Sequence, residues 1–266
     1  MALYTLNFES QYLGVKHTVC VIMPDRPQNV PAAEFFGSGK KYRVMWFLHG
    51  TFGDATDWVR KSMLEIYARE HELICVMPSG LNADYTSWPK FATGFDMKSY
   101  LTKELMPLIY NWLPASDKRE DNFIAGLSMG SFGALQYALD NPTLFAGAAM
   151  LSGTPEDPAG ISLEKIKERG MTRRLNQIEN AGGYDEWLKN NAWDKFFKAF
   201  EDGVDLPKLY FSCGTNDTLL YDRYCVFKQA VQAKGLDVEF HEIEGLGHEW
   251  RFWDRDIQNV FRYFEL

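Results

Sequence analysis

The chain has 266 residues, of which 46% are hydrophobic and 24% are charged, a balance typical of a globular protein with a sizeable core. Its net charge of −8 argues against a nucleic-acid partner and against binding to an anionic membrane surface. No apolar run approaches the roughly 20 residues that cross a bilayer, and the N-terminus lacks the regions of a secretory signal, so we expect a cytoplasmic protein. The chain has no internal repeat and no low-complexity linker, so we expect one domain over residues 1–266.

Short apolar runs and helical segments alternate along the chain. Seven runs are predicted to be β-strands: residues 19–23, 42–48, 73–77, 122–127, 146–151, 209–213 and 238–243. Five segments have helical periodicity: residues 57–70, 97–113, 131–139, 220–234 and 253–264. This alternation predicts an α/β fold with a mostly parallel central sheet and helices on both faces. In such a sheet, ligands bind beyond the carboxyl ends of the strands.

Residues 154–207 depart from this alternation. They contain no strand-like run, only charged, helix-prone sequence that is broken at Gly170 and at Gly182-Gly183. The segment begins directly after the predicted strand at 146–151, where an insertion would overhang the site. We therefore predict a helical cap, with helices that lead away from the site as the alternative.

The scattered cysteines and the absence of known metal and nucleotide motifs argue against several kinds of site. The four cysteines are scattered and form no C-x-x-C pair, and three of them lie in strand-like runs. Buried free thiols in a reducing compartment are therefore expected, rather than disulfides or zinc ligands. The sequence has no H-E-x-x-H motif, no P-loop and no G-x-G-x-x-G that opens a helix after the first strand. No metal or cofactor is predicted.

A G-x-S-x-G motif, Gly126-Leu127-Ser128-Met129-Gly130, joins the predicted strand at 122–127 to the predicted helix at 131–139. A strand, this turn and a helix together describe a nucleophile elbow. The turn is so tight that the neighbours of the serine must be nearly free of side chains, and the two glycines meet that demand. Ser128 is the predicted nucleophile, and a loop serine that caps a helix is the alternative.

A serine nucleophile needs a base, and the base needs an orienting acid. In α/β-hydrolases the chain order is nucleophile, acid, histidine, and only two of the five histidines follow Ser128. His248 lies in a glycine-rich loop after the last predicted strand, whereas His241 lies inside a strand pattern, so His248 is the predicted base. Asp217 follows the preceding strand through a glycine turn and is the predicted acid. Asp222 is the fallback, and a helix N-cap is the alternative role for Asp217.

Acyl transfer also needs donors for the developing oxyanion. The backbone N–H of Met129, directly after the nucleophile, is one predicted donor. The second usually comes from the loop after an earlier strand, and residues 48–53 form a glycine-bearing turn in that place. The N–H of Thr51 is the first choice and that of Phe52 the second, with a plain strand-to-helix turn as the alternative.

The aromatic residues, 15% of the chain, allow two interpretations. One is a large aromatic core. The other is a pocket for an aryl or sugar-bearing substrate, whose candidate lining residues are Tyr85, Trp88, Trp250 and Trp253.

Motifs along nearly the whole chain, from Ser10-Gln11 to the last helix, resemble one family. They are Phe47-Leu48-His49-Gly50 with Asp57-Trp58, Val76-Met77-Pro78-Ser79, the strand and elbow at 123–130, Leu151-Ser152-Gly153, residues 213–217 and residues 247–253. Together they resemble the esterase D-like family of α/β-hydrolases. This family includes S-formylglutathione hydrolases, antigen 85 mycolyltransferases, feruloyl and acetylxylan esterases, and bacterial tributyrin esterases, the branch to which the likeness is strongest. One departure is Ser131, which stands where the family usually has a second glycine.

The resemblance implies an α/β-hydrolase fold and a cofactor-independent serine carboxylesterase that acts on short-chain acyl esters, with acetyl and aryl esters included. It implies Ser128, Asp217 and His248 as the triad and Thr51 as the second oxyanion donor. The alternatives are a thioesterase of the S-formylglutathione hydrolase type, an acyltransferase, and a non-catalytic binding module on the same scaffold. The expected partner is a small-molecule ester, with no nucleic acid and no membrane, and the oligomeric state is left open between a monomer and a homo-oligomer.

Overall fold

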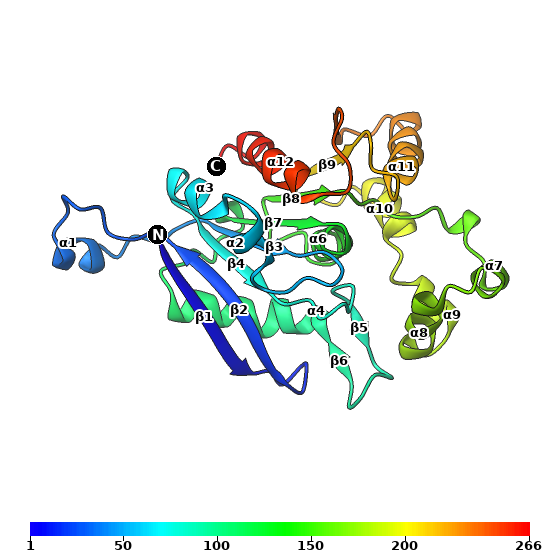
Figure 1. Ribbon diagram of the computed structural model, residues 1–266, viewed down its shortest axis with the longest axis horizontal. Coiled ribbons are helices and arrows are strands. Elements are labelled where there is room, and N and C mark those ends of the chain that lie inside the picture. The colour runs from blue at the N-terminus through cyan, green and yellow to red at the C-terminus, as the bar shows by residue number, and fades with distance from the viewer.

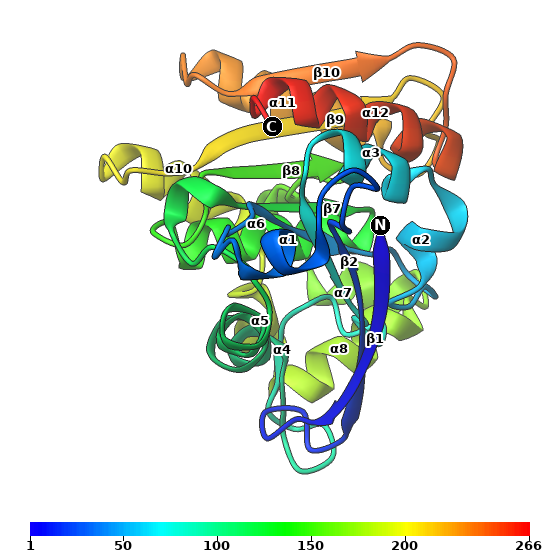
Figure 2. The same ribbon diagram turned by 90° about the vertical axis from the view of Figure 1, so that its left-hand side faces the viewer.

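A computed structural model describes residues 1–266 and contains one large sheet. Its eight strands lie in the order β1-β2-β4-β3-β7-β8-β9-β10 (Figure 1; β10 is labelled in Figure 2). Their bounds are β1 Ala2–Glu9, β2 Lys16–Met23, β3 Val44–Leu48, β4 Ile74–Pro78, β7 Asn122–Leu127, β8 Gly147–Leu151, β9 Lys208–Gly214 and β10 Glu239–Ile243. Strands β4, β3, β7, β8, β9 and β10 are parallel, whereas β1 and β2 form an antiparallel edge. The predicted α/β-hydrolase fold with a mostly parallel sheet is confirmed.

Helices cover both faces of this sheet (Figure 2). One face carries α2 Asp57–Lys61, α3 Leu64–Glu70 and α12 Trp250–Tyr263; the other carries α5 Met106–Trp112, α6 Met129–Asp140, α10 Ala192–Glu201 and α11 Tyr221–Ala233. Strand β3 shows why the central strands read as continuous apolar runs. Trp46 lies in one hydrophobic cluster and its neighbour Phe47 in the other, so successive side chains are buried on opposite faces.

Some elements differ from the prediction. The helix expected over 57–70 is broken at Ser62-Met63, where the Met63 N–H donates to Asp254 Oδ1 at 2.7 Å. The helix expected over 97–113 contains a π-helical stretch, Tyr100–Leu105, between α4 Met97–Ser99 and α5. Strand β1, helix α1 Ala32–Gly37 and the short hairpin of β5 Ser87–Trp88 with β6 Phe95–Asp96 were not predicted. None of these has a continuous buried apolar run, which is the pattern that identifies the central strands.

The segment 154–207 is helical and contains no strand, as predicted. Its elements are a 3₁₀ turn at Pro158–Gly160, α7 Leu163–Glu168, α8 Thr172–Ala181, α9 Tyr184–Leu188 and α10. Figure 1 shows α7, α8 and α9 at one end of the molecule, beyond α6 and α10, with α1 at the opposite end. Because β8 and β9 are hydrogen-bonded neighbours, the segment leaves and rejoins the sheet between adjacent strands.

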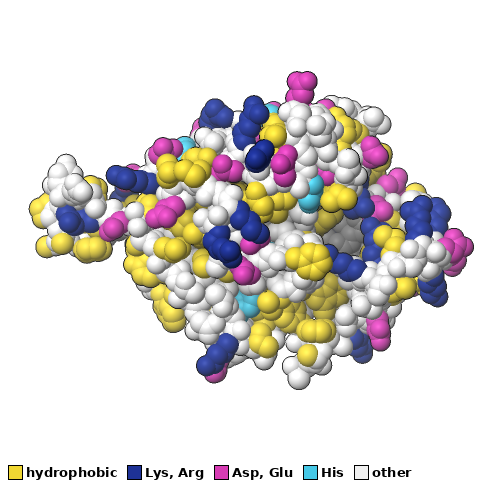
Figure 3. Space-filling view, viewed as in Figure 1, with side chains coloured by type: hydrophobic (Ala, Val, Ile, Leu, Met, Phe, Trp, Pro, Cys, Tyr) yellow, Lys and Arg dark blue, Asp and Glu magenta, His cyan; other side chains and the backbone are white.

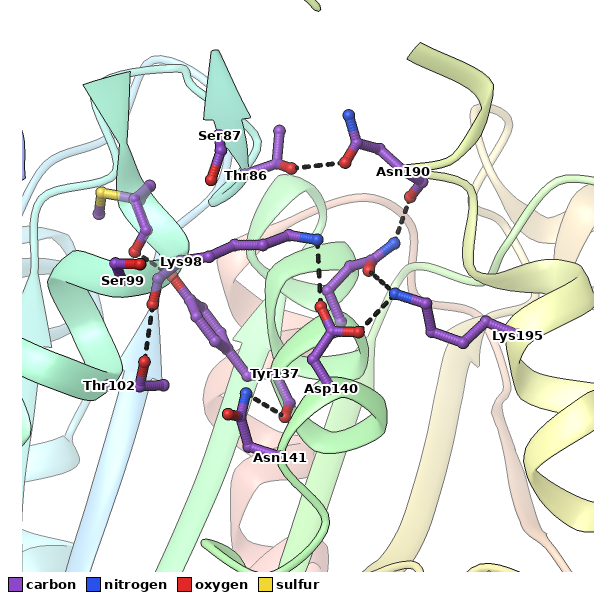
Figure 4. Close-up of polar contacts among 12 residues, drawn as sticks. Thr86, Ser87, Lys98, Ser99, Thr102, Tyr137, Asp140, Asn141, Asn190 and Lys195 are labelled. Carbon is purple, nitrogen blue, oxygen red and sulfur yellow. Dashed lines mark hydrogen bonds and ion pairs between the residues drawn. The ribbon is translucent and has the colours of Figure 1, made fainter. Parts of the chain in front are cut away.

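Polar contacts anchor this segment to the core (Figure 4). Asp140, the last residue of α6, pairs with Lys98 of α4 at 3.1 Å and with Lys195 of α10 at 2.5 Å. The Thr86 hydroxyl donates to Asn190 Oδ1 at 2.9 Å, which ties the chain before α10 to the chain before β5. The segment is therefore attached to α6, the helix that follows the elbow, and to the chain before β5.

The cysteines are all free, and three of them are buried, as predicted for the thiols. None of the helices combines the length and apolar character that a membrane span requires.

Candidate active site

The structure brings Ser128, Asp217 and His248 together beyond the carboxyl ends of three parallel strands. Ser128 lies between β7 and α6, Asp217 follows β9, and His248 lies in the loop between β10 and α12. His248 Nε2 is 2.9 Å from Ser128 Oγ, and His248 Nδ1 is 2.8 Å from Asp217 Oδ2. A serine hydroxyl, an imidazole and a carboxylate thus form one hydrogen-bonded chain.

The tight turn expected at the elbow is present. Ser128 has φ 51° and ψ −116°, a conformation that is strained for a residue with a side chain. A Cβ added to Gly126 would lie 2.0 Å from the Gly130 carbonyl oxygen, and one added to Gly130 would lie 2.3 Å from that of Leu48. Both positions therefore exclude a side chain on steric grounds.

Gly126→Ala is expected to destabilise the protein by about 3 kcal/mol or more and to displace the serine, because the backbone that blocks the new methyl group cannot yield cheaply. The free energy of unfolding and the rate of fluorophosphonate labelling measure the two effects. Gly160→Ala is the matched control, since no heavy atom lies within 4 Å of its added Cβ. Equal stability of the two variants would contradict the steric account.

Ser131 fits where a second glycine is usual because its neighbour at position 153 is a glycine. The Ser131 hydroxyl donates to the Ser128 carbonyl oxygen at 2.6 Å. A Cβ at Gly153 would lie 1.6 Å from Ser131 Oγ. The serine thus occupies the space that Gly153 leaves and adds a hydrogen bond to the elbow.

Asp217 has a fully buried side chain that is saturated with donors. Its Oδ1 accepts the backbone N–H groups of Leu219 and Leu220, both at 3.0 Å, and its Oδ2 faces His248. Burial by itself raises the pKa of this carboxyl, but the hydrogen bond and charge of His248 and the two amides together hold its pKa below the usual value. Asp217 is therefore ionised at neutral pH, whereas the fallback Asp222 is exposed.

The neighbours of His248 select its tautomer and its orientation. The Asp217 carboxylate can only accept, so Nδ1 carries the proton and Nε2 is left to accept the Ser128 hydroxyl. The Trp253 ring packs edge-on against the imidazole at 5.1 Å between centroids. The His248 side chain is 19% exposed, so the base is shielded from most of the solvent.

The predicted oxyanion donors lie beside the nucleophile. A Cβ at Gly50 would be 3.3 Å from Ser128 Cβ, so the loop after β3 runs directly against the elbow. The Thr51 N–H has no acceptor within the protein. Met129 is the first residue of α6, where N–H groups have no partner inside the helix. The second choice, Phe52, was wrong: its N–H donates to Asn82 Oδ1 at 2.6 Å and is already occupied.

A buried histidine, missed by the sequence analysis as a site residue, fixes the shape of this loop. His49 Nε2 accepts the Gly80 N–H at 2.6 Å, and His49 Nδ1 lies 2.7 Å from the Gly50 carbonyl oxygen. Since Nε2 accepts, the proton resides on Nδ1 and the imidazole is neutral. Burial lowers its pKa more than the hydrogen bond to Gly50 and the nearby carboxylates raise it. The neutral ring thus joins the loop after β3 to the loop after β4.

This lowered pKa makes stability depend on pH. A histidine whose pKa is lower in the folded state contributes stability in full above its ordinary pKa of about 6.5, and this contribution is lost as the pH falls toward the lowered value. From pH 7.5 to 5.5 the wild type is expected to lose about 1 kcal/mol of unfolding free energy through His49. Urea unfolding of His49→Gln should show a correspondingly weaker pH dependence. An unchanged slope would mean that the buried ring is not held neutral.

The serine opens into a cleft of about 360 Å³. Thr51, Met129, Ser128 and His248 line its floor, and the helical segment lines it with residues between Glu156 and Ala192, so this segment borders the site as a cap does. Figure 3 shows a hollow on this face, with dark blue arginine or lysine side chains along its edge.

Of the predicted substrate contacts, only Trp88 lines this cleft. Tyr85 is fully buried, and its hydroxyl donates to the His49 carbonyl oxygen at 3.2 Å. Trp250 packs instead edge-on against Trp58 at 5.2 Å and against Trp253 at 5.3 Å. Tyr85 and Trp250 are therefore packing residues, and the prediction that they line the pocket was wrong.

Sequence reasoning also missed three arginines in the cleft wall, Arg173, Arg174 and Arg223. The first two open α8 and the third lies in the first turn of α11. No motif marks them, because helix-prone charged sequence is usually a solvated face.

Comparisons with known proteins identify the family of this chain. The family model described as "Putative esterase" matches residues 10–264. An acetyl esterase of Caldicellulosiruptor saccharolyticus is 28% identical over 273 aligned residues, which cover 99% of this chain and 98% of that protein. Two solved structures from Staphylococcus aureus also match over 99% of this chain and 98% of their own. They are an S-formylglutathione hydrolase, with 25% identity and a TM-score of 0.77, and the fluorophosphonate-binding serine hydrolase F, with 26% identity and a TM-score of 0.78.

Proposed function

The chain belongs to this esterase family and is a carboxylic ester hydrolase, and on that premise we propose that it is a serine carboxylesterase for short-chain acyl esters that works through an acyl-enzyme. The observation that carries the proposal is the hydrogen-bonded chain from Ser128 through His248 to Asp217. No cofactor takes part in the proposed reaction.

In the proposed mechanism, Ser128 Oγ attacks the ester carbonyl carbon while His248 Nε2 takes the hydroxyl proton. The backbone N–H groups of Met129 and Thr51 stabilise the negative charge on the carbonyl oxygen. His248 then gives the proton to the leaving alcohol, and the acyl group stays on the serine. A water molecule activated by the same imidazole releases the acid, and the Asp217 carboxylate stabilises the imidazolium in both halves of the reaction.

Thioester hydrolysis is the second candidate. It is favoured by the likeness to the S-formylglutathione hydrolase, which covers nearly the whole of both chains. The same elbow, base and oxyanion donors serve an oxygen ester and a thioester, since the attacked carbonyl is common to both.

Short acyl groups, acetyl above all, are proposed because the matched curated relative is an acetyl esterase.

The test is a fluorophosphonate titration of the active site beside the turnover of p-nitrophenyl acetate, p-nitrophenyl butyrate and an S-acylglutathione. Labelling of one serine per chain, mapped to Ser128, with turnover of the oxygen esters supports the carboxylesterase. A kcat/KM for the thioester far above that for the oxygen esters would move the thioesterase to first place. Folded protein that is neither labelled nor active would overturn the proposal.

A further inference from the structure

The charge of the cleft wall is opposite to that of the protein. The chain as a whole carries a net charge of −8. The cleft, however, is lined by three arginines and by only two carboxylates, Asp84 and Glu156. The excess positive charge therefore lies inside the cavity that holds Ser128.

One of these arginines is neutralised by its own carboxylate. Arg173 Nη2 donates to Asp84 Oδ1 at 2.7 Å, and its Nη1 donates to the Thr51 hydroxyl at 3.1 Å. Gln177 also donates to the second oxygen of Asp84. This pair is complete and adds no net charge to the cleft.

The other two arginines share a single carboxylate oxygen. Arg174 Nη2 lies 2.6 Å from Glu156 Oε2, and Arg223 Nη2 lies 3.1 Å from the same atom. Neither guanidinium has another acceptor within the protein, although each has five N–H groups. Two positive charges thus face one negative charge, and most of their N–H groups have no acceptor within the protein.

The side chains that carry these donors are partly buried. The side chains of Arg174 and Arg223 are 21% and 27% exposed, and the Arg174 guanidinium lies 5.9 Å from the centre of the Trp187 ring. Burial and the neighbouring charge of Arg174 lower the pKa of Arg223, against the opposing effect of Glu156. Arg174 is also in the first turn of the 10-residue helix α8, whose positive end adds to the potential.

We propose that the preferred substrates of this hydrolase are esters that carry a negatively charged group, a carboxylate, which Arg174 and Arg223 bind while the ester carbonyl lies at Ser128. The planar guanidinium presents paired N–H donors that match a carboxylate, and a second carboxylate beside Glu156 would restore charge balance. The inference rests on the proposed function, because it assigns the substrate class of the same serine site.

The experiment compares two pairs of probes that differ in charge and little in shape. One pair places the carboxylate on the alcohol part: 4-acetoxybenzoate and its methyl ester. The other places it on the acyl part: mono(4-nitrophenyl) adipate and 4-nitrophenyl hexanoate. For each pair, kcat/KM of the anionic probe is divided by that of the neutral probe, so that comparison of this ratio between variants cancels the intrinsic reactivity of the probes.

In at least one pair, Arg174→Gln and Arg223→Gln are each expected to lower this ratio about tenfold, because a charge-assisted hydrogen bond to the substrate is lost. Glu156→Gln is expected to raise it, because the competing carboxylate is removed. Arg169→Gln is the matched control, since Arg169 lies in the same segment but does not line the cleft. Thermal unfolding checks that each variant is folded.

The outcomes separate the inference from the function on which it rests. If the arginine variants hydrolyse the neutral esters at wild-type rates and no variant changes the ratio in either pair, the anionic substrate class alone is overturned. A ratio that falls equally in Arg169→Gln would also overturn it, since the effect would then come from overall charge. If folded wild-type protein shows neither ester turnover nor serine labelling, the proposed function is overturned as well.

Discussion

Replacing Ser128 with alanine is expected to lower kcat for a short-chain ester by about 10⁴- to 10⁶-fold and to leave the fold intact. The serine, the histidine and the acid act as a unit, so the loss of the attacking oxygen removes almost the whole benefit of the other two groups. The backbone should tolerate the change, because alanine keeps the Cβ and removes only one oxygen, and its hydrogen-bond partner His248 lines the cleft rather than the packed core.

The measurement is kcat for p-nitrophenyl acetate, together with thermal unfolding and fluorophosphonate labelling of the same preparation. Ser38→Ala is the control, since Ser38 is an exposed serine directly after α1 and is absent from the lining of the cleft. Turnover in Ser128→Ala within tenfold of the wild type would show that another group carries the chemistry, and the mechanism above would have to be abandoned.

Asp217→Asn is expected to lower kcat/KM by roughly 10³- to 10⁴-fold, an effect on the tautomer rather than on the geometry. The asparagine oxygen can still accept the N–H groups of Leu219 and Leu220. Its amide nitrogen then faces His248 and donates to Nδ1, so the imidazole proton moves to Nε2. An Nε2 that carries a proton cannot accept the hydroxyl proton of Ser128.

The same variant has an acid-dependent effect on stability. Because the folded-state pKa of Asp217 is lowered, its ionised form contributes stability that is present above the ordinary value of about 3.9 and is lost as the pH falls through the folded-state value. The stability difference between the wild type and Asp217→Asn is therefore expected to be larger at pH 7 than at pH 3. Urea unfolding at both pH values measures it, with the exposed Asp222→Asn as the control. A difference that grows toward low pH would contradict the assigned charge state.

The sequence identifies those parts of the molecule whose physical demands are local. Strand β7 and the elbow are recognisable because a strand buried on both faces must be apolar throughout and because Gly126 and Gly130 have no room for a side chain. Edge strand β1 escapes this logic, since more than half of its residues are exposed and its pattern is weak. The positions of Asp217 and His248 in loops after the last two strands are likewise readable, because chain order in this fold is fixed.

The rest of the site depends on which distant segments meet. Glu156 lies in a loop, and Arg174 and Arg223 lie in two different helices. Only the complete fold brings both arginines to the Glu156 carboxylate. Aromatic residues pose the same difficulty in reverse. Composition alone cannot distinguish Trp88, which lines the cleft, from Tyr85, which fills the core behind it. The N–H of Phe52 was misjudged for a similar reason, because its acceptor lies 30 residues away.

The proposed catalytic groups and part of the cleft wall, including Arg174 and Glu156, occupy different stretches of the chain. The helical segment leaves the sheet after β8 and returns at β9, and these two strands pair with each other without it. Its length and sequence can therefore diverge among descendants of one ancestor while Ser128, Asp217 and His248 keep their places. Natural selection, or a designer who exchanges this segment between relatives, can thus change which ester is accepted without rebuilding the catalyst.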